Sequence, residues 1–171
     1  MAVSKMGAAR SDAAPRLTHL DEEGRLKMVD VGGKERTERV ARVRGEIRMV
    51  PRTARLIADN KVQKGSVLEA ARLAGIMAAK RTGELIPLCH PLNLTAVSVD
   101  FQVGEDRVEV EAEAKIVDRT GVEMEALVAA STALLTIYDM CKGVDRGMVI
   151  GQLRLMEKRG GRSGTWVRDE G

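Results

Sequence analysis

The chain has 171 residues, of which 44% are hydrophobic and 2% aromatic, enough apolar material for one folded domain and too much for wholesale disorder. Its formal net charge is +3 and its pI about 9.0, a smaller basic excess than nucleic-acid-binding domains usually carry. With so few aromatic side chains for stacking on bases, the core is expected to consist of Val, Leu, Ile, Ala and Met.

Cysteine and histidine are scarce. Cys89 and Cys141 form no Cys-x-x-Cys pair, so neither a structural zinc site nor an iron–sulfur cluster is predicted. Free thiols fit a reducing compartment, and we expect a cytoplasmic protein. Residues 1–15 lack the apolar segment of a signal peptide and are predicted to be a disordered tail. No run is expected to span a membrane.

The first third of the chain predicts a strand followed by two helices. Apolar and polar residues alternate over 40–50, which is typical of a strand. Proline then begins a short helix over 51–60. A second, alanine-rich helix is predicted over 66–81, with Ser66 and Glu69 as a capping box.

The middle of the chain predicts a rigid loop and a hairpin. Residues 83–91 contain two prolines and are predicted to form a loop. Two alternating stretches follow, 94–103 and 107–117, and glycine beside acidic residues at 104–106 indicates the turn between them.

The last third predicts the longest helix and a final strand. Thr120 and Glu123 fit a second capping box, and the helix is expected to end near Lys142, before Gly143. The final strand is predicted over 148–157.

This order of elements is strand, helices, strand, strand, helix, strand. It predicts an α+β, ferredoxin-like split β-α-β fold, with an antiparallel sheet and helices on one face. We expect a single domain over residues 16–160 and a flexible C-terminal tail over 161–171 that contributes to the site. Because an open sheet leaves one face and its edges uncovered, we also expect an oligomer.

Two loop residues are candidates for chemistry. Lys64 directly precedes a helix start, which favours an anion there, although an exposed turn lysine has the same sequence signature. His90, in LIPLCHPL, fits either a general acid/base or a loop histidine bonded to the backbone. Nothing near Cys89 indicates a lowered pKa, so we expect it to pack rather than to act as a nucleophile.

The long helix carries acidic residues at both ends. Glu123 is explained as a capping partner, whereas Glu125 is either a first-turn acid stabilised by the helix dipole or a functional group. Asp139 opposes the dipole, and Lys142 three residues later offsets this either as an ion pair or as an acid/base couple. Glu125 and Asp139 share a helix face but lie about 21 Å apart along the axis. A small ligand cannot contact both within one subunit, so either one of them is outside the site or a second subunit completes it.

The segment KRGGRSG near the C-terminus fits a phosphate-binding loop in which Lys158 and Arg162 supply charge. A solvated basic tail would look the same. Neither a Walker A loop nor a G-x-G-x-x-G motif occurs, so ATP and dinucleotide cofactors are not supported.

Taken together, these segments resemble one known family. LTHLDEEGRLKMVDVGGK, AAKRTGELIPLCHPL, TGVEMEALVAAS, LTIYDMCK and GGRSG occur in this order between Leu17 and Gly164. They are similar to the molybdenum cofactor biosynthesis protein C family, and LIPLCHPL with GVEMEAL is highly specific for it.

The resemblance implies a lyase that converts 3',8-cyclo-7,8-dihydroguanosine triphosphate, made by a separate radical enzyme, into cyclic pyranopterin monophosphate and pyrophosphate. It implies a homo-hexamer built as a trimer of dimers, with sites at subunit interfaces. We expect no metal site, no integral cofactor, and neither nucleic acid nor membrane as a partner; whether Mg²⁺ accompanies the triphosphate is left open.

Site residues follow from the same resemblance. The expected catalytic residues are Lys142, Asp139, Lys64 and His90. The expected substrate-binding residues are Glu123, Met124, Glu125, Cys89, Asp30, Arg39, Lys158 and Arg162. Arg162 stands where the family often has lysine; since a guanidinium does not deprotonate, phosphate binding is its expected role.

Two other functions fit the same fold. A regulatory module would bind a guanine nucleotide without chemistry. An RNA-binding domain would need strand aromatics, and Phe101 is the only aromatic residue on a predicted strand.

Overall fold

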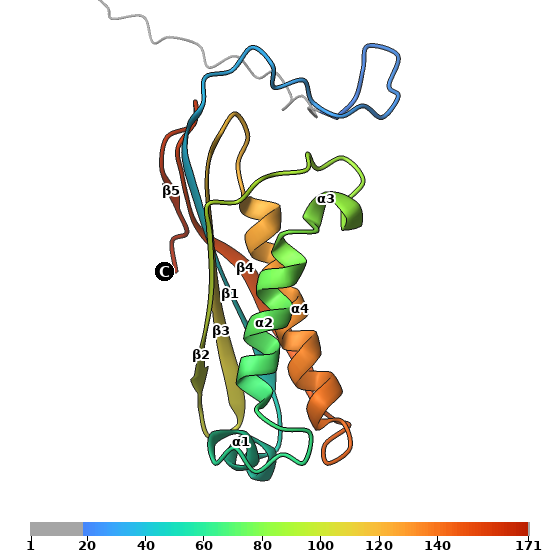
Figure 1. Ribbon diagram of the computed structural model, residues 1–171, viewed down its shortest axis with the longest axis vertical. Coiled ribbons are helices and arrows are strands. Elements are labelled where there is room, and N and C mark those ends of the chain that lie inside the picture. Colours follow the sequence, from blue (N-terminus) through green and yellow to red (C-terminus); the bar gives the residue numbers. More distant parts are fainter. Residues whose placement is uncertain (1–18, 171) are drawn as a thin grey trace, which may run out of the picture.

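The computed structural model describes residues 19–170 (Figure 1). The expected N-terminal tail, residues 1–15, lies outside the described residues.

The described chain forms one antiparallel sheet with the strand order β2-β3-β1-β4-β5. The strands are β1 (Thr37–Arg48), β2 (Ala96–Val103), β3 (Arg107–Asp118), β4 (Val149–Arg159) and β5 (Trp166–Val167). The order of the first four strands confirms the ferredoxin-like arrangement. The two-residue β5 pairs with β4 and lies inside the segment 161–171 expected to be flexible.

The helices cover one face of this sheet. They are α1 (Pro51–Ala58), α2 (Val67–Ala79), α3 (Thr82–Leu85) and α4 (Glu123–Cys141). Figure 1 shows α2 and α4 side by side against the sheet, with α1 at one end of the molecule and α3 at the other. The prediction of helices on one face is confirmed; the four-residue α3 was expected to be loop.

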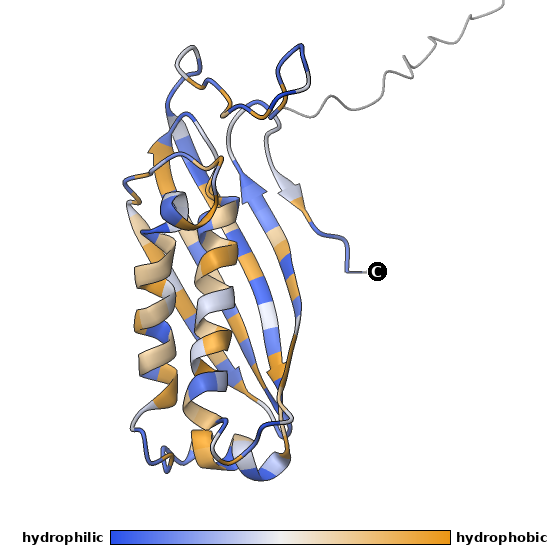
Figure 2. Cartoon of the chain, turned by 90° about the vertical axis from the view of Figure 1, so that its right-hand side faces the viewer, coloured by the Kyte–Doolittle hydropathy of each residue, from blue (hydrophilic) through white to orange (hydrophobic). Residues whose placement is uncertain are grey.

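Alternation along the strands separates the core from solvent (Figure 2). In β3, every second residue faces the helices and is buried. These residues are Val108, Val110, Ala112, Ala114 and Ile116. The residues between them are mostly charged and face outward, which is why the strand reads as alternating in the sequence.

Small residues let α2 and α4 approach closely. Ala71, Gly75 and Ala79 are all buried on one side of α2. A β-carbon added at Gly75 would lie 2.8 Å from the carbonyl oxygen of Ala129 in α4. The core is thus built from small aliphatic side chains, as the low aromatic content predicts.

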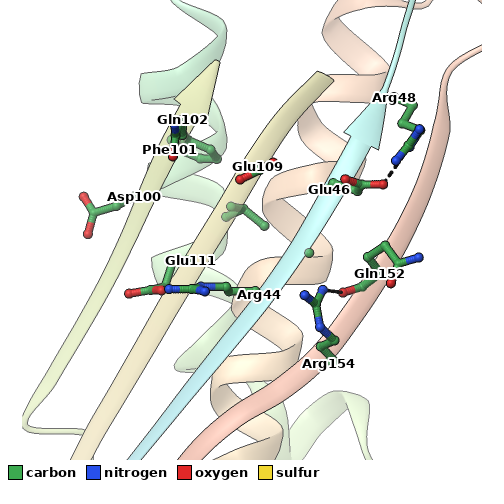
Figure 3. A pocket seen from close by; sticks show the side chains of 12 residues that line it. Arg44, Glu46, Arg48, Asp100, Phe101, Gln102, Glu109, Glu111, Gln152 and Arg154 are labelled. Atoms are coloured by element: carbon green, nitrogen blue, oxygen red, sulfur yellow. Dashed lines mark hydrogen bonds and ion pairs between the residues drawn. The ribbon is translucent and has the colours of Figure 1, made fainter. Parts of the chain in front are cut away.

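The face of the sheet without helices carries a network of ion pairs between arginine and glutamate side chains (Figure 3). Arg44 lies 2.7 Å from Glu111, and Arg48 lies 2.7 Å from Glu46, beside a hollow of about 510 Å³. Arg42 reaches a third glutamate, Glu113, at 3.0 Å. This face is therefore largely charged, and the expectation of an oligomer stays a prediction. Exposed apolar side chains lie on the helices, at Leu73, Met77 and Leu135, and also on the strands, at Val117, Val149 and Leu153.

Two predicted capping boxes do not form. Ser66 does precede α2, but its side chain makes no capping hydrogen bond among the described residues. α4 begins at Glu123, with Val122 in the N-cap position, so the predicted pairing with Thr120 is wrong. The helix starts too late for Thr120 to be its N-cap residue, and the Glu123 carboxylate instead lies 3.2 Å from the ammonium group of Lys158.

By length and composition alone, α4 could span a membrane, contrary to the expectation that no run would qualify. It packs against α2, β1 and β3, however, and nine of its residues are buried there. Its apolar composition is that of a central core helix.

Candidate active site

Six of the expected site residues line one cavity of about 440 Å³ beside the N-terminus of α4. We call this cavity the acidic pocket. These residues are Cys89, His90, Glu123, Met124, Glu125 and Lys158. They come from three segments far apart in the sequence: the loop after α3, the first turn of α4 and the end of β4.

The loop after α3 is held in place by backbone contacts. The N–H of Cys89 donates a 3.0 Å hydrogen bond to the carbonyl oxygen of Ile86. A β-carbon at Gly83 would lie 3.2 Å from the backbone of Pro91, so α3 and the loop pack closely. This packing brings His90 to the start of α4, a position that the sequence did not indicate.

Glu125 is the most buried acid of the acidic pocket, with 3% of its surface exposed. Burial raises its pKa from an ordinary value of 4.5 to about 7; the negative charge of Glu123 also raises it, and a hydrogen bond from its own backbone N–H opposes the rise. Both protonation states are therefore populated near neutral pH. Such a carboxyl group can donate or accept a proton or a hydrogen bond from a ligand.

The acidity of Cys89 also changes in the acidic pocket. Burial, and then the negative charge of Glu125, raise the pKa of its thiol. A raised pKa keeps the sulfur protonated and weakly nucleophilic. This agrees with the expectation that Cys89 contacts the ligand or packs, rather than attacking it.

A second cavity, of about 720 Å³, adjoins the acidic pocket. We call it the basic basin because five cationic side chains line it. These are Lys34, Arg39, Arg119, Lys158 and Arg162. A single carboxylate, Glu35, faces them among the described lining residues, so the basic basin is suited to several phosphate groups.

Lys158 and Lys34 line both cavities, which therefore lie side by side. Lys34 and Arg119 were not singled out from the sequence. Lys34 stands in the quoted segment VDVGGK, which could have directed attention to it, whereas Arg119 follows a strand in a loop and carries no such signal.

Two glycines bring the chain after β4 onto Arg39. Gly160 and Gly161 both have positive φ, at 94° and 76°, which favours glycine. A β-carbon at Gly160 would overlap the carbonyl oxygen of Glu38, and one at Gly161 would overlap the Arg39 guanidinium. The Arg39 Nε also donates to the carbonyl oxygen of Asp118 at 3.2 Å, so its charge is held at the floor of the basic basin.

The remaining expected catalytic residues form a separate group, the lysine cluster, at the C-terminal end of α4. Lys142 Nζ lies 2.6 Å from Asp139 Oδ1, which confirms this predicted pair. Lys64 Nζ donates a 3.0 Å hydrogen bond to the Asp139 carbonyl oxygen and lies 3.7 Å from its Oδ2. The hydrogen bond from Lys142, with the charges of both lysines, lowers the pKa of Asp139.

The lysine cluster and the acidic pocket lie at opposite ends of α4 (Figure 1). Asp139 and Glu125 are about 21 Å apart along the helix axis, as its rise per residue requires. The side chains of Lys64 and Lys142 are 52% and 53% exposed. Within one chain, therefore, these lysines reach neither the acidic pocket nor a water-free environment.

Asp30 lies beside the acidic pocket rather than in its wall. Its Oδ1 accepts a 2.7 Å hydrogen bond from the backbone N–H of Gly32, which fixes a turn. The neighbouring Val29 and Val31 do line the acidic pocket. The structure thus gives Asp30 the role of shaping the segment that carries them.

No group of three or more His, Cys, Asp and Glu side chains within residues 19–170 is placed to hold a metal ion.

Comparison with known proteins gives a consistent result. A family model described as the MoaC family matches residues 28–161. A relative from Novosphingobium aromaticivorans, named cyclic pyranopterin monophosphate synthase, is 61% identical over 154 residues, which cover 90% of this chain and 98% of the relative. A relative of the same name from Desulforapulum autotrophicum is 60% identical, covering 89% and 94%. One from Thermomicrobium roseum is 57% identical, covering 90% and 94%.

Proposed function

Because this chain belongs to the MoaC family, we propose that it is a cyclic pyranopterin monophosphate synthase of molybdenum cofactor biosynthesis. The reaction converts 3',8-cyclo-7,8-dihydroguanosine triphosphate into cyclic pyranopterin monophosphate and pyrophosphate. The observation that carries the proposal is the junction of the acidic pocket with the basic basin. A substrate that joins a purine-derived ring system to a triphosphate needs these two environments side by side.

The basic basin binds the triphosphate in this proposal. Arg39 and Arg162 present planar guanidinium groups, which bind phosphate oxygens in pairs, and Lys158 adds a point charge at the boundary with the acidic pocket. Arg39 is already held by backbone carbonyls, so little conformational entropy is lost when the phosphates bind.

The acidic pocket binds the rings. Glu125 and His90 supply hydrogen-bonding groups for the ring nitrogens and the carbonyl, and Met124 and Cys89 supply apolar contact. Since Glu125 has a pKa of about 7, it matches either the donors or the acceptors of the ring without a large protonation penalty.

The chemistry needs proton transfers at several atoms. Water opens the five-membered ring of the substrate, and a molecule of water is released when the pyrazine ring closes. A ribose-derived hydroxyl then attacks the α-phosphorus and pyrophosphate leaves, so substrate and products balance. Lys142, with Asp139, transfers protons in these steps, and Lys64 assists or neutralises developing charge.

A second copy of the chain brings the lysine cluster to the acidic pocket. Glu125 and Asp139 lie seven residues on either side of Thr132, so a two-fold axis near Thr132 would place Asp139 of one copy beside Glu125 of the other. The exposed Leu73 and Leu135 of α2 and α4 supply apolar area for such a contact. Three of these pairs would make a hexamer. Closure of the pair would also remove the water that surrounds the lysines in one chain.

The test is to incubate the purified protein with the cyclised nucleotide, with and without Mg²⁺. Pyrophosphate release and the fluorescence of the oxidised pterin are followed together. We expect both to appear in equal amounts. Saturable binding without either product would instead identify a guanine-nucleotide-binding regulatory module.

A further inference from the structure

The chain after the basic basin is attached to the sheet. In β5, Trp166 pairs with Lys158, and Val167 pairs with Glu157. The next residue, Arg168, extends this attachment: its backbone N–H donates to the carbonyl oxygen of Met156 at 2.8 Å.

Side chains reinforce the same attachment. The Nε of Arg168 donates to the Leu155 carbonyl oxygen at 2.7 Å, and its guanidinium lies 5.6 Å from the centre of the Trp166 ring. Glu170 lies 2.7 Å from Arg154 and 3.8 Å from Arg44 on the charged sheet face. We call residues 166–170 the C-terminal clamp.

The clamp closes the loop that carries Arg162. The first end of this loop is fixed where Gly160 and Gly161 press against Glu38 and Arg39. The N–H of Gly164 donates to the carbonyl oxygen of Gly161 at 3.1 Å, and β5 begins two residues later. Arg162 thus projects from a short loop whose two ends are both attached to the sheet.

We propose that the C-terminal clamp positions Arg162 for the triphosphate, which makes residues 166–170 positioning residues for phosphate affinity. The inference rests on the proposed function, because it takes the basic basin as the phosphate site. A loop held at both ends loses less conformational entropy on binding than a free tail. None of the clamp residues lines the basic basin, so they act through Arg162.

Steady-state kinetics with the cyclised nucleotide test this role. A variant ending at Gly164 and the single variants Glu170→Gln and Arg168→Ala are compared with the full chain. For the truncated chain we expect KM to rise about tenfold with kcat within about twofold, since uniform substrate binding is lost and the reacting groups stay in place. Glu69→Gln is the matched control, because Glu69 makes an exposed 3.4 Å ion pair with Arg72 on α2. Arg154→Lys retains the positive charge that pairs with Glu170, so its KM should stay close to the wild-type value.

Trp166 is the only tryptophan of the sequence, so its fluorescence reports on the clamp directly. Titration with inorganic pyrophosphate should change the Trp166 emission of the full chain. Arg162→Ala should abolish this response, and Glu170→Gln should shift it to about threefold higher pyrophosphate concentration, as expected for the loss of a partly exposed ion pair.

Two results would overturn the inference. One is an unchanged KM and pyrophosphate affinity in Glu170→Gln and Arg168→Ala, a criterion that holds even if the truncated chain fails to fold. The other is a loss confined to kcat. Failure of the proposed function is distinguishable, because the wild-type chain would then make no product, whatever the clamp variants do to pyrophosphate binding.

Discussion

Glu125 and Asp139 belong to the same helix, yet their carboxyl groups lie in opposite environments. Glu125 is buried beside another acid, which raises its pKa, whereas Asp139 lies in solvent between two lysines, which lower its pKa. Groups whose proton affinities are driven apart in this way are suited to different roles in acid/base chemistry. The environment, rather than the residue type, lets Glu125 hold a proton near neutral pH and keeps Asp139 ionised.

The raised pKa of Glu125 predicts a pH-dependent contribution to stability. Because the folded chain holds this proton more tightly than the unfolded chain, the contribution is complete below about pH 4.5 and is lost as pH rises through about 7. Glu125→Gln, which stays neutral, should therefore be more stable than wild type at pH 8, by up to roughly 3 kcal/mol, and similar at pH 4.5. Urea unfolding at both pH values measures this. The same stability difference between the two proteins at both pH values would contradict the prediction. Glu69→Gln, at an exposed position, is the control.

The lysine cluster predicts a loss of turnover without a loss of structure. Lys142→Ala removes a half-exposed ammonium group whose partner, Asp139, is itself exposed, so stability should change by less than about 1 kcal/mol. Turnover should fall at least about 100-fold if Lys142 transfers a proton. The readouts are product formation, thermal unfolding and size-exclusion chromatography. Lys115→Ala on the charged sheet face is the control, and full activity in purified Lys142→Ala would refute the assignment.

Much of the site could be predicted from sequence at this scale, but not the partners of each residue. The Asp139–Lys142 pair follows from helical spacing alone. Lys158 and Glu123 are in contact although they are 35 positions apart in the sequence. A local sequence pattern cannot predict a contact between residues so far apart. The capping assignment of Glu123 was wrong because α4 starts at Glu123 itself, which leaves Thr120 outside the N-cap position.

At the scale of elements, the close contact between α2 and α4 depends on a glycine, Gly75, which has no side chain to separate the two helices. Gly75 costs helix propensity, yet it lets the backbone of Ala129 approach to a distance that a β-carbon could not tolerate. A helix pair packed on glycine and alanine is held at one separation, because neither side can rearrange a rotamer to absorb a change.

Gly75→Ala should therefore destabilise the protein, although alanine is the better helix former. The added carbon would lie 2.8 Å from a carbonyl oxygen, and overpacking of this kind costs roughly 1–3 kcal/mol. Gly143→Ala is the matched control, since a β-carbon there meets nothing within 4 Å. Chemical unfolding measures both, and equal stability of the two variants would contradict the prediction.

Elements with strong periodicity were predictable, and those defined by distant contacts were not. The alternation of β2 and β3 and the length of α4 gave their positions to within a few residues. β5 has two residues and exists only because β4 offers it an edge, while α3 is a single turn within a loop. Neither carries enough sequence for a period to be recognised.

At the scale of the whole molecule, the proposed site residues are divided between the two ends of the helical layer. The acidic pocket and basic basin lie at the end that contains α3, and the lysine cluster lies at the end that contains α1 (Figure 1). The helix rise already indicated this separation from sequence. The sequence did not indicate which surface would join two copies, because side-chain exposure depends on the packing of all elements together.

A mixing experiment tests whether two copies share each site. His90→Ala and Lys142→Ala affect different ends of the molecule, and each should be inactive alone. When the two are co-expressed in equal amounts, half of the pairs contain one of each, and one of the two sites in such a pair is intact. About a quarter of wild-type activity should then return. No recovery in a verified mixed assembly would show that every site belongs to one chain.

The close packing of α4 has a consequence for how this chain can change in length. Adding or removing three or four residues, about one helical turn, would rotate one end of α4 by roughly 40–60° relative to the other and would displace the two ends by about 5 Å. If two copies share each site, this displacement would move the lysine cluster of each copy away from the acidic pocket of the other. Proton transfer would stop, because it requires the donor and acceptor within hydrogen-bond distance. If two copies share the site as proposed, the length of α4 between Glu125 and Asp139 is therefore fixed by the reaction as well as by the fold.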